Sequence, residues 1–280
     1  MSDEAIVVGI DGSPNAQAAL AWAVRRAERT GAPVRAVMSW HYPSVLLLPL
    51  VGQAVPPAES MEQATAEALA VIVEPIASTT SATVEQAVRQ GAPAATLLAE
   101  SEHAALVVVG REAPSDSLLR GSVSRRVAAA ASCPVVVVPA GVEPDLDGPI
   151  VVGVDGSDHS IAAIRWAAAA TDGPIVVLHV AGRLLSPAFG NLSDDMLARL
   201  DQAVVDAAVD SAGVDRSRVT TRVVEGDARE VLADPSLGAS LIVLGARGAT
   251  GLDALVLGSV ATSVAALAPV PVAVVPPPEG

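Results

Sequence analysis

A glycine-spaced stretch near the C-terminus carries the residue types best suited to chemistry. Residues 245–259 read GARGATGLDALVLGS, with Gly245, Gly248 and Gly258-Ser259 as the spaced positions. Because glycine lacks a Cβ atom, the backbone can turn tightly there and approach a ligand closely. Successive amides in such a loop form an anion-binding concavity, and Gly258-Ser259 opens a predicted helix whose free N–H groups favour phosphate. The stretch predicts a phosphate-binding loop; the alternative is a set of ordinary turns and a helix cap.

A second, altered version of this stretch lies in the first half of the chain. Residues 110–122 read GREAPSDSLLRGS and keep Gly110 and Gly121-Ser122. The spacing is two residues shorter, Ala113 stands where the second glycine would match, and Asp116 would repel phosphate if it pointed inward. The remaining cap at Gly121-Ser122 could still accept a phosphate. We expect this half to keep the fold and to have a lost or altered ligand.

Two aspartates follow closely similar apolar runs. The sequence IVVGIDGS at 6–13 returns as IVVGVDGS at 150–157, with seven of eight positions identical. Asp11-Gly12-Ser13 and Asp155-Gly156-Ser157 therefore stand at matching strand ends. A carboxylate there suits ribose hydroxyls, or a metal ion that bridges phosphates.

The repeat extends over the whole chain. Residues 121–139 match 258–276, and Trp22 and Trp166 lie at equal distances from their repeat starts. The segment between the copies, 140–148, is rich in Pro, Gly and Asp. These observations predict two similar domains, 1–140 with the altered loop and 149–280 with the intact one.

Each copy alternates apolar strands with helices, which indicates an α/β fold. Such strands are typical of parallel sheets covered on both faces, and right-handed crossovers then give two doubly wound five-stranded domains. Ligands bind such sheets beyond the carboxyl ends of the strands, where we expect the first and fourth strands to flank the crevice. The strands expected in the first copy are 5–11, 34–40, 83–89, 105–110 and 134–139. A helix is expected at 59–79, and the matching helix of the second copy is expected at 194–212.

Composition excludes several classes of function. The net charge of −14 argues against general binding to nucleic acid or to an anionic membrane surface. All 17 basic residues are arginine, so a P-loop lysine and Schiff-base chemistry are absent. A single cysteine, Cys133, excludes an internal disulfide. No signal peptide or membrane span is apparent, and a cytoplasmic location is the expectation.

The glycine spacing G-x2-G-x9-G-S, together with VGVDGS on the first strand of the second copy, resembles the universal stress protein family as a tandem, two-domain member. The resemblance implies a Rossmann-like fold of the adenine nucleotide alpha hydrolase-like type that binds ATP, with Mg expected beside it. It implies a regulator of growth or survival under stress, acting through an unknown protein partner. It also implies a homodimer in which the closing strands of the domains pair.

The same resemblance implies the nucleotide-binding residues. In the second copy they are Asp155, Gly156, Ser157, Val180, Gly245, Arg247, Gly248, Gly258, Ser259 and Val260. In the first copy they are Asp11, Gly12, Ser13, Trp40, Gly110, Gly121, Ser122 and Val123. The main chain at the end of the second strand, His179-Val180, would contact the adenine.

Other residues have simpler interpretations. His179 is expected as a satisfied strand-end residue and His159 as a surface residue, although His159 could approach phosphate. Arg247 and Arg111 are interpreted as matching loop residues that either bind phosphate or make solvent or interface contacts. Cys133 and the two tryptophans read as core. The uncharged segment 44–52, SVLLLPLVG, is either a lid folded on its own domain or an interaction surface.

The closing strands would be exposed sheet edges, so we expect them to pair with each other, within the chain or between chains. No pair of acid and base, nucleophile with base, or metal cage is apparent, so we expect no enzyme, with slow ATP hydrolysis left open. A nucleotide-independent interaction scaffold is the alternative. An adenylyl transferase or flavoprotein on a related fold is a weaker one.

Overall fold

The computed structural model describes residues 4–42, 56–111, 123–182, 193–248 and 256–277. The segment 44–52 lies outside these residues. In the first unit the elements are β1 (Ala5–Gly9), α1 (Pro14–Thr30), β2 (Val34–Trp40), α2 (Ala58–Ala77), β3 (Val84–Gln90), α3 (Pro93–Ser101), β4 (Ala104–Gly110), α4 (Val123–Ala130) and β5 (Val135–Val138). In the second they are β6 (Ile150–Val154), α5 (Asp158–Ala170), β7 (Ile175–Ala181), α6 (Asp194–Ala212), β8 (Val219–Glu225), α7 (Ala228–Ala233), β9 (Leu241–Gly245), α8 (Ser259–Leu267) and β10 (Val272–Val275), with short 3-10 turns at Arg216–Arg218 and Pro235–Leu237.

All ten strands form one sheet, in the order β3-β2-β1-β4-β5-β10-β9-β6-β7-β8. Within each unit the strands are parallel and follow the doubly wound order 3-2-1-4-5, as the sequence predicts. β1 lies next to β4, and β6 next to β9, so the crevices form where the chain order reverses. The α/β fold and the position of the crevices are therefore confirmed.

The closing strands pair with each other inside the chain. β10 runs antiparallel to β5, with Val272 opposite Val137 and Val274 opposite Val135. Because β5 has β4 on its other side and β10 has β9, neither strand leaves an open edge for a second copy. The expected pairing of the two closing strands is therefore confirmed, and it occurs within the chain. A homodimer stays a prediction.

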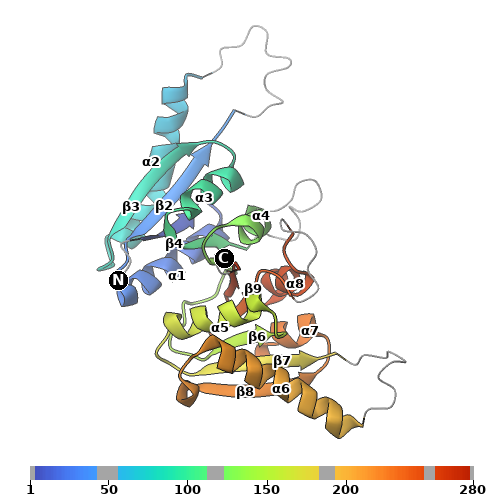
Figure 1. Ribbon diagram of the computed structural model, residues 1–280. Helices are drawn as coiled ribbons and strands as arrows, with labels where there is room; N and C mark the ends of the chain where they lie inside the picture. The colour runs from blue at the N-terminus through green and yellow to red at the C-terminus, as the bar shows by residue number, and fades with distance from the viewer. Residues whose placement is uncertain (1–3, 43–55, 112–122, 183–192, 249–255, 278–280) are drawn as a thin grey trace.

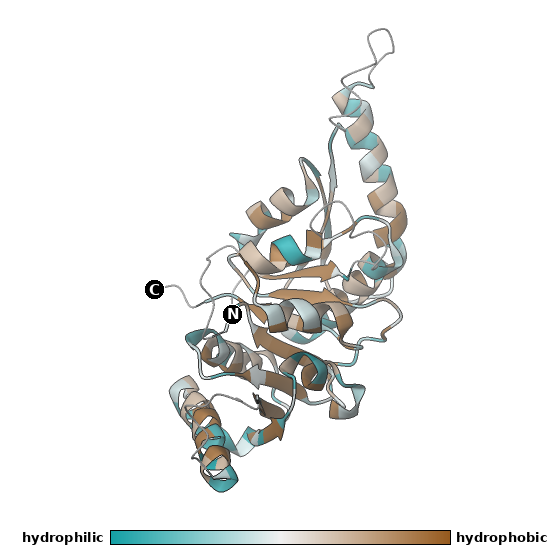
Figure 2. Cartoon of the chain, turned by 90° about the vertical axis from the view of Figure 1, so that its right-hand side faces the viewer, coloured by the Kyte–Doolittle hydropathy of each residue, from teal (hydrophilic) through white to brown (hydrophobic). Residues whose placement is uncertain are grey.

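Helices cover both faces of the sheet (Figures 1 and 2). One continuous core cluster includes buried residues of α1, α2, α5 and α6, and the other includes buried residues of α3, α4, α7 and α8. Trp22 is fully buried and Trp166 partly buried in the first cluster, and Cys133 is buried in the second. Their interpretation as core residues is confirmed. Among the described residues, no helix is both long and apolar enough to cross a bilayer.

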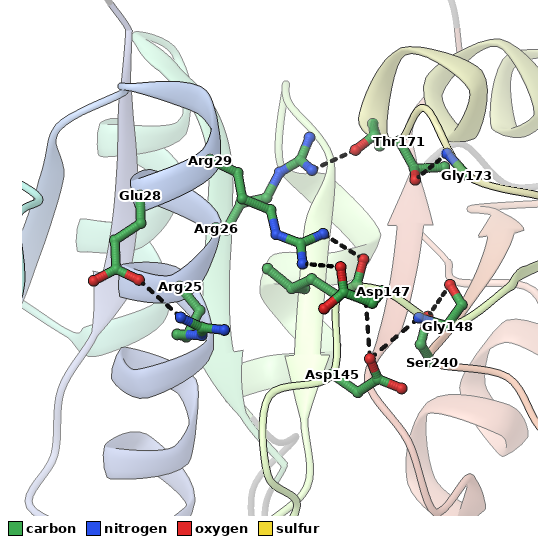
Figure 3. Close-up of polar contacts among 12 residues, drawn as sticks. Arg25, Arg26, Glu28, Arg29, Asp145, Asp147, Gly148, Thr171, Gly173 and Ser240 are labelled. Carbon is green, nitrogen blue, oxygen red and sulfur yellow. Dashed lines mark hydrogen bonds and ion pairs between the residues drawn. The ribbon is translucent and has the colours of Figure 1, made fainter.

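Polar contacts also link the two units on the α1 side (Figure 3). Arg29 donates to the carbonyl of Leu146 at 2.5 Å and pairs with the carboxylate of Asp147 at 2.5 Å. Arg26 donates to the carbonyl of Ala170, at the end of α5. Since the Asp147 side chain is 84% exposed, its ion pair contributes little, and the apolar strand pairing supplies most of the interface energy.

The continuous core predicts that the two units unfold together. Val136 is fully buried in the strand pair, opposite Ala273. Replacing it as Val136→Ala should lower the free energy of unfolding by about 2 kcal/mol, through lost burial and a residual cavity. Urea unfolding should show one transition. Val71→Ala, at a 75% exposed position on α2, should leave stability unchanged. Two separate transitions, with only one of them shifted, would contradict a shared core.

Candidate functional site

The second unit contains a cavity at the carboxyl ends of β6 and β9. Its volume is about 520 Å³. The predicted residues that line it are Asp155, Val180, Gly245, Arg247, Gly248, Gly258, Ser259 and Val260. Two regions distant in sequence, the β6 turn and the glycine loop, thus meet around one space, as the topology requires. Residues 249–255 of the loop lie outside the described residues.

The Asp155-Gly156-Ser157 turn is built by its own hydrogen bonds. Asp155 Oδ1 accepts from the backbone N–H of Ser157 at 3.0 Å and from its hydroxyl at 2.6 Å. Gly156 has φ +82°, a conformation that favours glycine. The Ser157 hydroxyl caps α5 by accepting from the N–H of Ser160. Gly156 and Ser157 therefore shape the turn and do not line the cavity, whereas Asp155 does.

The three spaced glycines, Gly245, Gly248 and Gly258, differ in what an added Cβ atom would meet. A Cβ on Gly245 would lie 2.7–2.9 Å from Cβ, C and O of His159, so this glycine lets β9 approach α5. A Cβ on Gly248 would come within 2.5 Å of Asp155 Oδ2. Gly258 has φ −57° and ψ 149°, which any residue adopts, and an added Cβ would find its nearest neighbours at 3.4 Å. Packing therefore requires glycine at 245, and it does not at 258.

The N-terminus of α8 opens on the cavity. Gly258, Ser259, Val260 and Ala261 all line it, and no described side chain caps this helix. By contrast α1, α5 and α6 each begin with a serine whose hydroxyl accepts a backbone N–H. The first amides of a helix lack partners within the helix and carry its positive end. The cavity therefore offers backbone donors to an anion at this end.

Part of the cavity wall is aliphatic. Leu178 and Val180 come from β7, Ala228 and Leu232 from α7, and Leu244 from β9. Sequence reasoning missed the α7 residues, because a helix of six residues shows too short a pattern to orient. This wall suits a flat apolar group, while the loop and Asp155 supply polar contacts.

The two histidines near the cavity differ in their contacts. His179 lines it, and its Nδ1 donates to the carbonyl of Val154 at 2.8 Å, while Nε2 lies 3.5 Å from Asp201. The expectation of a satisfied strand-end histidine is confirmed. His159 is partly buried rather than a surface residue. Its burial lowers its pKa, and the nearby Arg247 cation lowers this pKa further, against the opposing effect of Asp155 and Asp158. A neutral His159 leaves Arg247 as the positive side chain of this loop.

The first unit has a smaller cavity of about 380 Å³ at the matching place. Asp11, Ser13, Gly110 and Val123 line it as predicted, and Gly12, at φ +85°, shapes the turn. Gly121 and Ser122, like Ala113 and Asp116, lie outside the described residues. The predicted Trp40 does not belong to this lining. Its ring is buried and packs edge-on to Tyr42, with 5.5 Å between ring centroids.

Backbone hydrogen bonds show why Trp40 was misplaced. The carbonyl of Trp40 accepts from Gly91, as the carbonyl of Ala181 accepts from Gly226. Trp40 therefore matches Ala181, and Ser39 matches Val180 and lines the first cavity. A sequence comparison could not place this strand end, because the second strands start at different distances from the repeat starts.

Backbone hydrogen bonds also correct the match between Arg111 and Arg247. The N–H of Arg111 donates to Val138, as the N–H of Ala246 donates to Val275. Arg111 therefore replaces Ala246, and Arg247 lies one residue further along. Ser39, Thr96, Asn15 and Arg111 all line the first cavity.

Comparison with known proteins agrees with this architecture. The family profile described as the universal stress protein family matches residues 4–139 and 148–276. The chain belongs to the universal stress protein family. A universal stress protein of Mycolicibacterium smegmatis is 30% identical over 291 residues, covering 97% of each chain. One of Mycobacterium tuberculosis is 31% identical over 294 residues, covering 96% of this chain and 95% of the relative.

A solved universal stress protein of Archaeoglobus fulgidus shares the fold. It superimposes with a TM-score of 0.69 at 19% identity, covering 99% of this chain and 97% of the other. The superposition therefore covers both units of the present chain. The two matched segments coincide with the two units of the sheet.

The glycine geometry gives a test that separates packing from ligand approach. Gly245→Ala should lower the free energy of unfolding by about 1–3 kcal/mol, because its methyl group would meet the α5 backbone. Gly258→Ala should change stability by less than about 0.5 kcal/mol. Urea unfolding of both variants measures the difference. Equal destabilisation by the two substitutions would contradict the separate roles of these glycines.

Proposed function

We propose that this universal stress protein binds ATP in its second unit. The supporting observation is a single cavity that joins an uncapped helix N-terminus, a glycine loop, a carboxylate and an apolar wall. The triphosphate would lie against the amides of Ser259–Ala261 and beside Arg247, where helix dipole and guanidinium both favour negative charge. This end of the cavity is also where Gly258 leaves room for close approach.

The apolar wall is the place for the adenine ring. Val180, Leu178 and Leu232 present aliphatic surface to it, and the backbone of the β7 end offers hydrogen-bonding groups. The ribose would then lie between the wall and the loop, within reach of Asp155. A carboxylate that hydrogen-bonds a hydroxyl gains more than a neutral acceptor does.

Magnesium would enter with the nucleotide. The described residues contain no group of three His, Cys, Asp or Glu side chains that could hold a metal ion by themselves. Mg²⁺ commonly keeps several waters and binds one or two carboxylates plus substrate phosphates. Asp155, whose Oδ1 already serves the turn, could supply one ligand through Oδ2.

We propose binding, rather than catalysis, as the activity. Around the second cavity the described polar side chains are engaged in structure: His179 donates to Val154, and the Ser157 hydroxyl is held by Asp155. The Ser157 hydroxyl does not line the cavity, so its contact with Asp155 presents no nucleophile to a ligand there. Nucleotide-dependent contact with a regulatory partner in the cytoplasm, under stress or growth arrest, is the role that the family membership supports.

The two equivalent aspartates provide a matched test. Asp155→Asn keeps the acceptor that builds the turn and removes the charge, so ATP affinity should fall about tenfold or more. Asp11→Asn makes the same change in the first unit and should leave the second-unit affinity unchanged. Isothermal titration of the full chain with Mg-ATP measures both affinity and stoichiometry. Unaltered affinity in Asp155→Asn, or absence of binding by the wild type, would overturn the proposal.

A further inference from the structure

One arginine of the first unit holds a helix of the second. Arg111 follows β4 and lines the first-unit cavity. Its Nη1 donates to the carbonyl of Ala268 at 2.6 Å, across 157 positions of sequence. Ala268 is the C-cap of α8 and is buried, with 1% of its surface exposed. A buried carbonyl requires a donor, and this one receives it from the other unit.

The antiparallel junction of β5 with β10 brings these two groups together. It reverses the strand direction between the units, so the carboxyl edge of the first unit is continuous with the amino edge of the second. Arg111 lies at that carboxyl edge, because it follows β4 directly. Helix α8 starts at the carboxyl edge of its own unit, beside the second cavity, and runs back toward the amino edge. Its C-terminal end therefore meets Arg111.

The charge of Arg111 suits this position. The carboxyl end of a helix carries partial negative charge, which a cation stabilises. The last turn of α8 contains no basic residue of its own. Burial lowers the pKa of Arg111, as expected for a guanidinium partly removed from water, yet arginine stays protonated at neutral pH. The first unit thus supplies the cation that α8 lacks.

We propose that Arg111 is a positioning residue for the second-unit ligand site, and that it couples the two cavities through α8. The inference rests on the proposed function, since the N-terminal amides of α8 are the groups that would hold the phosphates. Arg111 fixes one end of this short helix, and the ligand contacts the other. Loss of the cation would leave the Ala268 carbonyl without its donor and loosen the amides that face the cavity.

Only the first unit has an arginine at this backbone position. Arg111 occupies the backbone position of Ala246 in the second unit, and Ala246 is buried and has no donor to offer the first unit. An anion that entered the first cavity and drew the guanidinium away from Ala268 would weaken ligand binding in the second. By linkage, a ligand in the second cavity would weaken binding of that anion by the same factor.

The test compares three variants of the full chain. Arg111→Ala removes the contact, and Arg111→Lys keeps a cation that can reach a carbonyl. Arg29→Ala removes a contact between α1 and the segment that joins the units, and this contact touches neither cavity. Hydrogen exchange of the peptide covering 257–267, titrated with Mg-ATP, reports affinity at α8 itself. The same peptide without ATP reports how firmly the helix is held.

We expect Arg111→Ala to weaken ATP binding about three- to tenfold and to speed exchange in the α8 peptide without ATP. Arg111→Lys should keep most of the wild-type ATP affinity and most of the wild-type protection from exchange. Arg29→Ala should leave the affinity and the exchange rate unchanged. Wild-type affinity in Arg111→Ala would overturn the inference, as would an equal loss in Arg29→Ala, which would indicate general loosening. If the wild type bound no ATP, the proposed function would fail. The exchange without ligand would still decide whether Arg111 holds α8.

Discussion

The antiparallel pairing of β5 with β10 is the contact on which the rest of the molecule depends. Both strands are buried on both faces, so neither can serve as a solvent-exposed edge. Their pairing joins two parallel sheets into one and lets a core cluster run along each face through both units. Because the two units run in opposite directions, the strands of one unit end where the strands of the other unit begin. Each cavity therefore lies beside the amino edge of the other unit, and a residue of one unit can reach a helix of the other.

Much of this could be predicted from the sequence because the chain repeats. Two copies of a strand–turn–helix pattern fix the element types, and the rule for ligand position in doubly wound sheets places the crevices. Asp155 and the glycine loop converge as expected because both follow strands that lie side by side. The partner of the closing strands could not be predicted, since an apolar edge requires a neighbour without specifying which chain supplies it.

The errors have a common physical origin in register. Trp40 and Arg111 were each matched to a residue one position away from the structural counterpart, because strand ends are set by hydrogen-bond partners. Once Trp40 is aligned with Ala181 and Arg111 with Ala246, the two cavities can be compared residue by residue. Ser39 stands in place of Val180, and a cation stands in place of a buried alanine. A shift of one residue also moves a strand side chain to the other face, so such an error changes the chemistry assigned to a site.

The two cavities share one backbone framework and differ in the residues that line them. The turn after the first strand is the same in both units, with an aspartate that accepts from a serine two residues on and a glycine at positive φ. Because the hydrogen bonds of this turn join residues two positions apart, they do not depend on the residues of the cavity walls. The walls differ because they come from β2 or β7 and from the helices after β3 or β8, where substitution leaves the turn intact. The first cavity is lined by Ser39, Thr96 and an arginine that reaches the other unit, whereas the second joins an aliphatic wall to a helix that no described side chain caps.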